Sequence, residues 1–299
     1  MRCNFERDHL AVALRDLGLG DFLTGIPALR ALARAYPEHD RVLVAPQAFA
    51  PLLELTGTGF TLAPEPPLHA DVAVNLHGKG PQSHERLRAA RPRRLIAFGC
   101  GPVWRPHEHE VHRWCRLLRE SGIAADPADL RLELDAPRHG ATIVHPGAAS
   151  AARRWPAERW NAVVKSLDRV IVTGGPGERA LAERVAAGTT AEIRAGDTDL
   201  MQLAELVAGA DRVLCGDTGV AHLATAFGIR SVVLFGPTPP HEWGPPPGGP
   251  HRALWAGRRG DPHGDTPDPG LLEIQVADVV SIAISGGCPS APASVSAGR

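Results

Sequence analysis

Short runs of valine, leucine and isoleucine alternate with amphipathic helical patterns along most of the 299-residue chain. Such alternation is typical of βα units and of a mostly parallel sheet. In the first half, the pattern predicts strands at 9–14, 41–45, 71–76 and 94–98, and helices at 22–36, 48–55 and 109–121. These elements are sufficient for one doubly wound α/β domain.

The alternation breaks at residues 123–140, which carry two prolines and several acidic residues, and it restarts at residue 142. Polar, proline-containing segments of this kind connect domains. We therefore expect two Rossmann-like doubly wound α/β domains, at residues 1–137 and 138–286, that face a central cleft. The second half predicts strands at 142–145, 170–173, 212–215 and 231–235, and helices at 156–166, 178–187, 200–208, 220–227 and 276–284.

Two segments fall outside the alternation. Residues 236–270 are dense in proline, glycine and histidine, and we expect no regular structure there. Long loops of this kind in compact domains are usually functional or disordered. Residues 287–299 form a low-complexity tail that we expect to be disordered.

The charges of the chain are balanced, with 32 Lys plus Arg, 33 Asp plus Glu and a net charge of −1. A nucleic-acid partner would require a strongly basic surface, so we expect none. The five cysteines are scattered without C-x-x-C spacing, which argues against a disulfide framework or a zinc knuckle and fits a reducing cytoplasm. The first ten residues lack the apolar stretch of a secretory signal, and no apolar run approaches the ~18 residues of a membrane span.

Three turns between strands and helices in the second half could hold an anion. They are HPGAASAARRWP at 145–156, TGGPGE at 173–178 and CGDTGVAHLA at 215–224. Each supplies small residues and backbone N–H groups near a helix start, where phosphate binds readily. Ligands of open α/β sheets bind at such strand ends, so three of these turns in one domain favour a phosphate-binding function.

The third turn carries several polar side chains. Asp217 and Thr218 precede the helix, and Gly219 permits a close approach of the backbone. His222 lies one helical turn beyond Thr218, so that both can face one ligand. An ordinary N-cap at Asp217 or Thr218 and a packed His222 would explain the same residues without a ligand.

The first turn contributes two arginines. Arg153 and Arg154 stand just before Trp155 and Pro156, and proline is common at the first position of a helix. A guanidinium at this place can bind a diphosphate through two parallel hydrogen bonds. A solvated arginine pair is the alternative.

Several other patterns have simpler interpretations. The triplet DTD at 197–199 resembles a metal-binding D-x-D, but we expect it to cap the following helix. The cluster HEHEVH at 107–112 lacks H-E-x-x-H spacing, because Val111 stands four residues after His107, and it indicates a solvated helix start. The basic run at 86–94 indicates a helix face and a strand entry, with an anionic acceptor as its alternative partner.

The segment GLGDFLTGIPALRAL at 18–32 resembles a dinucleotide-binding loop but lacks its spacing. G-x-G-x-x-G would need a third glycine where Leu23 stands, and Gly25 comes two residues late. This spacing argues against a nicotinamide dehydrogenase. Asp21 would also repel a pyrophosphate, whereas across a cleft from a nucleotide it is placed to act as a general base.

Four segments together resemble glycosyltransferase family 9, the heptosyltransferase family that transfers from ADP-heptose and has the two-domain GT-B fold. The resemblance spans both predicted domains, within residues 14–244. The segments are LRDLGLGDFLTGIPALRAL at 14–32, HPGAASAARRWPAERW at 145–160, VIVTGGPGERALAERV at 170–185 and LAELVAGADRVLCGDTGVAHLATAFGIRSVVLFGPT at 203–238.

The resemblance implies roles for individual residues. The family's catalytic aspartate corresponds to Asp21, and its basic residue before the W-P pair, usually lysine, corresponds to Arg153. The family's paired hydroxyls after the strand-end histidine are not matched by Gly147–Ala149, and Ser150 is the nearest hydroxyl. The implied donor-binding set is Arg153, Glu178, Asp217, Thr218, Gly219, His222 and Ser150.

The resemblance further implies a metal-independent, inverting transfer without a cofactor, in which a nucleotide sugar is the donor and a glycan or small molecule the acceptor. Asp21 would deprotonate the acceptor hydroxyl, while Arg153 and the helix start at Thr218 would stabilise the leaving nucleoside diphosphate. A lipid-linked acceptor would bring the protein to a membrane surface. The alternatives are a transferase with another donor, an epimerase on the same scaffold, or a non-catalytic nucleotide-sugar-binding protein.

Overall fold

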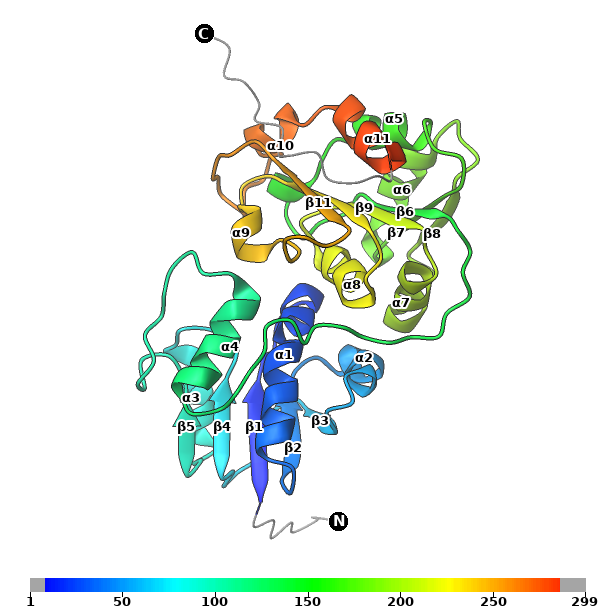
Figure 1. Ribbon diagram of the computed structural model, residues 1–299. Helices are drawn as coiled ribbons and strands as arrows, with labels where there is room; N and C mark the ends of the chain where they lie inside the picture. Colours follow the sequence, from blue (N-terminus) through cyan, green and yellow to red (C-terminus); the bar gives the residue numbers. More distant parts are fainter. Residues whose placement is uncertain (1–8, 286–299) are drawn as a thin grey trace.

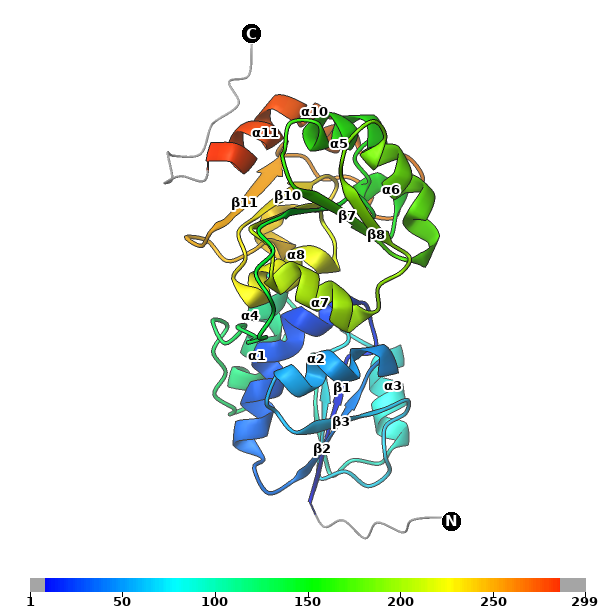
Figure 2. The same ribbon diagram turned by 90° about the vertical axis from the view of Figure 1, so that its right-hand side faces the viewer.

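A computed structural model describes residues 9–285 of the chain; the expected disordered tail at 287–299 lies outside the described residues. The chain forms two lobes, each built on a parallel sheet, which lie one above the other in Figure 1 and Figure 2. The expectation of two parallel α/β domains is therefore confirmed.

The first sheet has the strand order β3-β2-β1-β4-β5. All its strands are parallel, and the order reverses direction between β1 and β4, which is the switch point of a doubly wound sheet. Its elements are β1 (Leu10–Leu14), α1 (Leu19–Ala35), β2 (Asp40–Val44), the 3₁₀ helix η1 (Gln47–Phe49), α2 (Ala50–Leu55), β3 (Phe60–Ala63), β4 (Val72–Asn75), α3 (Gln82–Ala89), β5 (Arg94–Ile96) and α4 (Glu110–Glu120).

The second sheet has the order β11-β10-β9-β6-β7-β8, and it is also parallel throughout. Its switch point lies between β6 and β9. Its elements are β6 (Thr142–His145), η2 (Ala151–Arg153), α5 (Ala157–Val164), β7 (Val170–Gly174), η3 (Pro176–Glu178), α6 (Arg179–Ala186), β8 (Glu192–Ala195), α7 (Leu200–Ala208), β9 (Arg212–Gly216), α8 (Gly219–Phe227), β10 (Ser231–Phe235), α9 (Pro240–Trp243), β11 (His251–Trp255), α10 (Pro269–Glu273) and α11 (Val276–Ser285).

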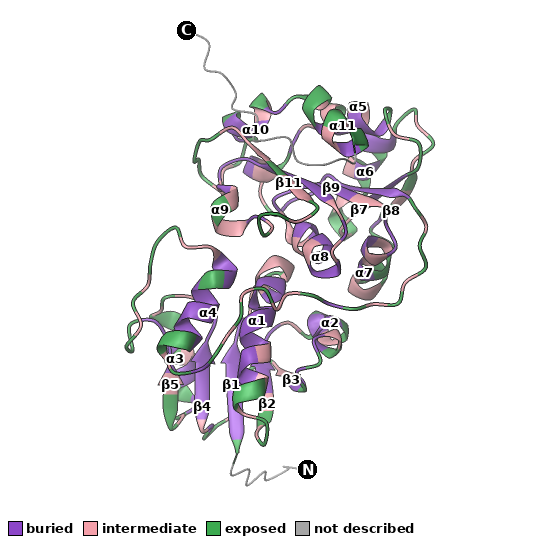
Figure 3. Ribbon diagram, viewed as in Figure 1, coloured by how far each residue is buried: buried purple, intermediate pink, exposed green. Residues whose placement is uncertain are grey.

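The central strands are buried on both faces, as the purple strands of Figure 3 show. Alternate residues of a strand point to opposite faces. In β1, Val12 packs with Leu87 of α3, whereas Ala11 and Ala13 belong to the cluster that contains α1 and α4. This two-sided burial explains why the strands appear in the sequence as continuous apolar runs.

The two lobes share one apolar cluster. It runs from the first sheet through α1 to α8, whose N-termini meet where the lobes face each other, and on to the near face of the second sheet. Phe22 of α1 and Val220 of α8 are both buried in it. The far face of the second sheet packs separately against α5, α6 and α11. The turns after β1, β6 and β9 are thereby directed at the space between the lobes.

Some elements were not predicted. Residues 123–140 carry no helix or strand, as expected, but β3 and β8 are absent from the prediction. Both are short edge strands in which polar residues interrupt the apolar pattern. Within the segment 236–270 the prediction was wrong, because β11 adds an edge strand to the second sheet and α9 forms a short helix. Among the described residues, no helix is both long enough and apolar enough to span a membrane.

Candidate functional site

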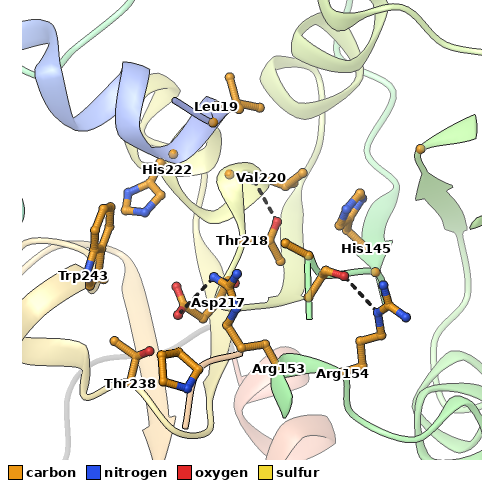
Figure 4. A pocket seen from close by; sticks show the side chains of 18 of the residues that line it. Leu19, His145, Arg153, Arg154, Asp217, Thr218, Val220, His222, Thr238 and Trp243 are labelled. Atoms are coloured by element: carbon orange, nitrogen blue, oxygen red, sulfur yellow. Dashed lines mark hydrogen bonds and ion pairs between the residues drawn. The ribbon is translucent and has the colours of Figure 1, made fainter. Parts of the chain in front are cut away.

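A cavity of about 1070 Å³ lies between the lobes. All three turns singled out in the second half of the sequence line it, together with residues 18–21 at the start of α1. The turns after β6 and β9 flank the switch point of the second sheet, and the turn after β7 follows the strand next to β6. Residues 18–21 follow β1 at the switch point of the first sheet, so the fold itself brings these segments to one place. Figure 4 shows the second-lobe side chains converging on this space, with Leu19 entering from the first lobe.

The turn between β9 and α8 presents a helix N-terminus to the cavity. Thr218 is the N-cap, and its Oγ1 accepts a hydrogen bond of 3.1 Å from the Val220 N–H. The cap alternative is therefore confirmed for Thr218. Asp217 is 7% exposed, and burial raises the pKa of its carboxyl to about 6, while the nearby Arg153 opposes the rise. At mildly acidic pH a carboxyl with this raised pKa is partly protonated, and in its neutral form it does not repel an anion beside it.

Arg153 is fixed beside this helix start. Its Nη1 lies 3.8 Å from the Asp217 Oδ2, and its Nε donates to the Ser150 Oγ at 3.4 Å. The Ser150 hydroxyl in turn donates to the Pro262 carbonyl at 2.6 Å. The Arg153 side chain is 24% exposed, so it is held on one side and open to the cavity on the other. The neighbouring Arg154 instead donates to the Ala148 carbonyl at 2.8 Å and stabilises the turn.

Glu178 lies at the far end of the same wall. Its Oε2 accepts a hydrogen bond of 2.8 Å from the Gly175 N–H, which fixes the carboxylate at the end of β7. A Cβ at position 147 would lie only 2.1 Å from the Glu178 Oε1. Only glycine at position 147 therefore lets the first and second turns share this wall.

His222 packs between the lobes. A Cβ on Gly20 would lie 3.0 Å from the His222 Cδ2, and the Trp243 ring lies 6.0 Å from the imidazole on the other side. Burial lowers the pKa of His222 to about 4, so the ring is neutral at pH 7. His222 is half-buried, so it packs between the lobes and also lines the cavity.

Asp21 reaches the cavity from the opposite wall, in the first turn of α1. Its side chain is 25% exposed, and burial raises the pKa of its carboxyl. The Arg15 guanidinium, 3.6 Å away, opposes that rise, and the Glu110 carboxylate adds to it. A partly exposed carboxylate of raised basicity has the properties of a general base.

Sequence reasoning missed part of the lining. His145, 9% exposed at the end of β6, bonds the Thr173 Oγ1 through its Nδ1 at 3.0 Å. Its place at the start of the first turn, directly at the end of a predicted strand, is the signal that could have found it. Trp243, at the end of α9, and Arg259 come from the segment 236–270, where the density of proline and glycine masks any periodic pattern in the sequence.

Two further sequence patterns can now be judged. Asp199 caps α7, with its Oδ1 accepting from the Gln202 N–H at 2.8 Å, so the DTD triplet is a helix cap as predicted. The solvated helix start predicted at 107–112 is wrong in part. Glu110 is only 4% exposed there, because Arg15 and Arg113 both donate to its carboxylate.

Within residues 9–285, one group of side chains could hold a metal ion, formed by His9, His39 and Asp71. These residues lie near the amino-terminal ends of the first sheet's strands, whereas the cavity lies at the carboxyl ends. The group is therefore separate from the cavity, and Arg93 already pairs with the Asp71 carboxylate at 3.1 Å.

Relatives were found by sequence. Lipopolysaccharide heptosyltransferase 1 of Pseudomonas aeruginosa is 31% identical over 129 residues, which are 42% of this chain and 34% of that protein. The similarity thus spans about a third of the relative's length. The profile of the family "Glycosyltransferase family 9 (heptosyltransferase)" matches residues 104–258, just over half of the chain.

Solved structures share the fold. A glycosyl transferase family 9 protein from Veillonella parvula has a TM-score of 0.76 at 17% identity, over 93% of this chain and 97% of that one. The ADP-heptose lps heptosyltransferase II of E. coli has a TM-score of 0.71 at 18% identity, over 92% and 98%. The iron-containing dodecameric glycosyltransferase TibC of enterotoxigenic E. coli has a TM-score of 0.63 at 17% identity, over 94% and 76%.

The two-lobed GT-B fold expected from the sequence is thus confirmed, since both lobes align with these structures over nearly the whole chain. The family profile covers the end of the first lobe and most of the second, including the turns around Arg153 and Asp217. The chain therefore belongs to glycosyltransferase family 9.

Proposed function

We propose that the protein is a glycosyltransferase that moves a sugar from a nucleoside diphosphate donor to an acceptor hydroxyl. The observation that carries this proposal is the meeting of three phosphate-suited turns and one carboxylate around a single cavity. ADP-heptose is the favoured donor, because the family and the E. coli structure both carry heptosyltransferase in their names. Residues 1–137 then form the acceptor domain and 138–286 the donor domain.

The donor diphosphate binds between the N-terminus of α8 and Arg153. The α8 dipole and its first N–H groups attract negative charge, and the guanidinium adds a cation on the other side. Asp217 and Ser150 orient Arg153, and Glu178 lies farther along the wall, where a carboxylate can accept from the hydroxyls of a ribose. Neutral His222 closes the cavity toward the first lobe.

The transfer is a single displacement with inversion. Asp21 takes the proton from the acceptor hydroxyl while that oxygen forms a bond to the anomeric carbon of the sugar. The bond from the anomeric carbon to the diphosphate oxygen breaks at the same time, and its electron pair leaves on the diphosphate. Arg153 and the α8 N-terminus stabilise the charge that develops there.

The reaction needs no metal in this proposal, because Arg153 and the helix N-terminus supply the positive charge. Addition of EDTA is therefore expected to leave the rate unchanged, and a loss restored by a divalent or iron salt would contradict it. The acceptor is a glycan or a small molecule with a free hydroxyl, with a lipid-linked acceptor placing the protein at a membrane surface. We also propose a cytoplasmic location, consistent with the free Cys100, Cys115 and Cys215 among the described residues.

A thermal-shift panel of nucleotide sugars tests the donor. ADP-heptose should raise the unfolding temperature more than UDP- and GDP-sugars, and NAD should have no effect. The donor that binds is then incubated with a panel of glycan and alcohol acceptors, and release of the nucleoside diphosphate is measured. Release that requires an acceptor supports a transferase, whereas binding without release by any acceptor supports a non-catalytic binding protein.

One observation favours a second donor. The small residues Gly147–Ala149 occupy the turn where the family resemblance implies paired hydroxyls, and Ser150 is engaged with Arg153 and Pro262. A pocket with fewer hydroxyls can accept a different sugar or base. A larger shift with another nucleotide sugar than with ADP-heptose would establish that alternative.

A further inference from the structure

A buried arginine lies directly behind Asp21. Arg15 follows β1 and is 1% exposed. Its Nη2 lies 3.6 Å from the Asp21 Oδ1 and donates to the Thr24 Oγ1 at 2.9 Å, and its Nε donates to the Asp21 carbonyl. Its Nη1 donates to the Leu76 carbonyl after β4. One side chain thus ties the first turn of α1 to both strands at the switch point.

A second buried charge holds Arg15 in place. The Glu110 Oε1 accepts from the Arg15 Nη2 at 3.1 Å and from the Trp114 Nε1 at 2.7 Å. The Trp114 ring also lies under the guanidinium, 5.0 Å from its Cζ. Arg113 donates to the other oxygen of Glu110. Because every polar atom of such a buried pair is bonded, the guanidinium has one position relative to Asp21.

Gly25 provides the space for Arg15. A Cβ at this position of α1 would lie 2.8 Å from the Arg15 Cδ and 3.0 Å from its Nε. Glycine inside a helix costs stability relative to alanine, so its presence needs a packing reason. The glycine that falls two residues late for a dinucleotide-binding loop therefore lies against this arginine.

We propose that Arg15, held by Glu110 and accommodated by Gly25, is the positioning residue that fixes the carboxylate of Asp21 for its reaction. This inference rests on the proposed function, in which Asp21 is the base. The geometry carries it: an arginine with no access to solvent bonds the backbone of the reacting residue and stands beside its carboxylate. Among the groups that stabilise the charged form of this carboxylate, Arg15 has the largest effect, ahead of the Gly18 backbone and His77.

The charges around Asp21 give this role a measurable sign. Asp21 faces Arg15 after β1, Glu110 on α4 and His77 after β4, while His222 of α8 stands across the gap and is neutral. Burial raises the pKa of Asp21 most, Arg15 lowers it, and Glu110 raises it. Removal of the Glu110 charge should therefore move the Asp21 titration to lower pH, and removal of the Arg15 charge should move it to higher pH.

The first experiment measures the Asp21 titration in the full chain. Carboxyl ¹³C NMR of labelled aspartates follows the pKa, and the Asp21 signal is identified by its absence in Asp21→Asn. Glu110→Gln is expected to shift the titration to lower pH. The matched control is Glu108→Gln, which removes a carboxylate two residues away that pairs with Arg116 instead, and it should leave the titration in place. An unchanged titration in Glu110→Gln would overturn the inference.

The second experiment moves Arg15 without changing any charge. Gly25→Ala is expected to lower ADP-heptose turnover by about tenfold or more, since misplacement of a reacting group by an ångström can cost on the order of 100-fold. ADP affinity should stay unchanged, because the donor binds the other lobe. Wild-type turnover would contradict the role of Arg15. If Gly25→Ala fails to fold, Arg15→Lys replaces it, with lowered turnover expected at a nearly unchanged Asp21 titration.

Asp21→Asn separates this inference from the proposed function. If that variant turns over ADP-heptose at the wild-type rate, the assignment of Asp21 as base fails, and the role of Arg15 fails with it. If Asp21→Asn is inactive while Glu110→Gln and Gly25→Ala both behave as wild type, the base assignment stands and the role of Arg15 and Glu110 alone is overturned.

Discussion

The two lobes have the same architecture but present opposite chemistry to the cavity. The second lobe offers glycine-rich turns, a helix N-terminus and the cation Arg153. The first lobe offers the carboxylate Asp21, in the first turn of a 17-residue helix whose N-terminus is equally positive. The first turn of α1 therefore carries a negative side chain, whereas the first turn of α8 carries none.

This difference shows that a parallel α/β fold fixes where a site lies, while side chains at the helix starts fix what it binds. Gly18 and Gly20 look like parts of a phosphate loop, yet Gly20 lies against His222 of the other lobe, and Gly25 lies against Arg15. Glycines of the second lobe also permit packing, since Gly219 lies against Leu19 and Gly147 lies against Glu178.

The largest expected effect comes from Asp21→Asn. The amide cannot accept the proton of the acceptor, so turnover should fall by about 100-fold to 10,000-fold, the usual contribution of a general base. ADP affinity should stay within a few-fold, because the nucleotide binds the second lobe. Turnover is measured by the release of ADP, and ADP affinity is measured by calorimetry. Near wild-type turnover would remove Asp21 from its role as base.

Acid should mimic this substitution in the wild-type protein. The rate requires a charged Asp21, so it should fall as pH drops through the raised pKa of that carboxyl. The pH profile of donor turnover at saturating donor is the measurement. A rate that is flat from neutral pH down to the ordinary range of an aspartate would show that no base of raised pKa acts in the reaction.

Arg153→Ala should weaken ADP binding by about tenfold to 100-fold, the range of a charge-assisted hydrogen bond. The matched control is Arg194→Ala, an exposed arginine of β8 that pairs with Glu192 away from the cavity. Calorimetry with ADP compares them. Equal ADP affinity in both variants would mean that Arg153 does not bind the diphosphate. The second lobe would then lack the cation that distinguishes it from the first lobe.

Gly219→Ala tests the close approach of the lobes. Its Cβ would lie 2.8 Å from the Leu19 Cβ, so the helix starts must separate or the side chain must move. We expect a destabilisation of about 1–3 kcal/mol, as for other overpacked positions. Gly78→Ala is the control, since a Cβ there meets nothing within 4 Å. Denaturant unfolding measures the free energy of unfolding of both variants. Equal values would show that Leu19 moves aside without loss of stability.

The smallest effect is expected from His107→Ala. The His107 Nδ1 lies 2.7 Å from the Glu242 Oε1 and links the lobes, but its side chain is 63% exposed. Exposed pairs contribute less than about 1 kcal/mol, so thermal unfolding should barely change. A large loss of stability would mean that this polar contact, rather than the apolar cluster between α1 and α8, holds the lobes together.

Most of the fold could be predicted from the sequence, because buried parallel strands leave continuous apolar runs. The edge strands β3, β8 and β11 could not, since an edge strand needs no such run and its partner, not its composition, makes it a strand. The three turns could be predicted as phosphate-suited, and the structure brings them together.

The buried pair of Arg15 and Glu110 could not be predicted from the sequence for a different reason. Glu110 stands 95 residues after Arg15 in the chain, and only the packing of α4 on α1 brings them together. The polar composition of the segment HEHEVH at 107–112 therefore predicts a solvated helix start, and nothing near it in the sequence reveals Arg15 as the buried partner of Glu110. His145 ends a strand that the sequence predicted and begins a predicted turn, where sequence alone does not distinguish a core side chain from one that lines a cavity.

The central claim is that the nucleotide belongs to the second lobe and faces Asp21 across the cavity. The crystal structure of the ADP complex tests it most directly. The diphosphate is predicted between the α8 N-terminus and the Arg153 guanidinium, with Asp21 free of any contact with it. A diphosphate bound instead at the start of α1, against Gly18 and Gly20, would contradict the account.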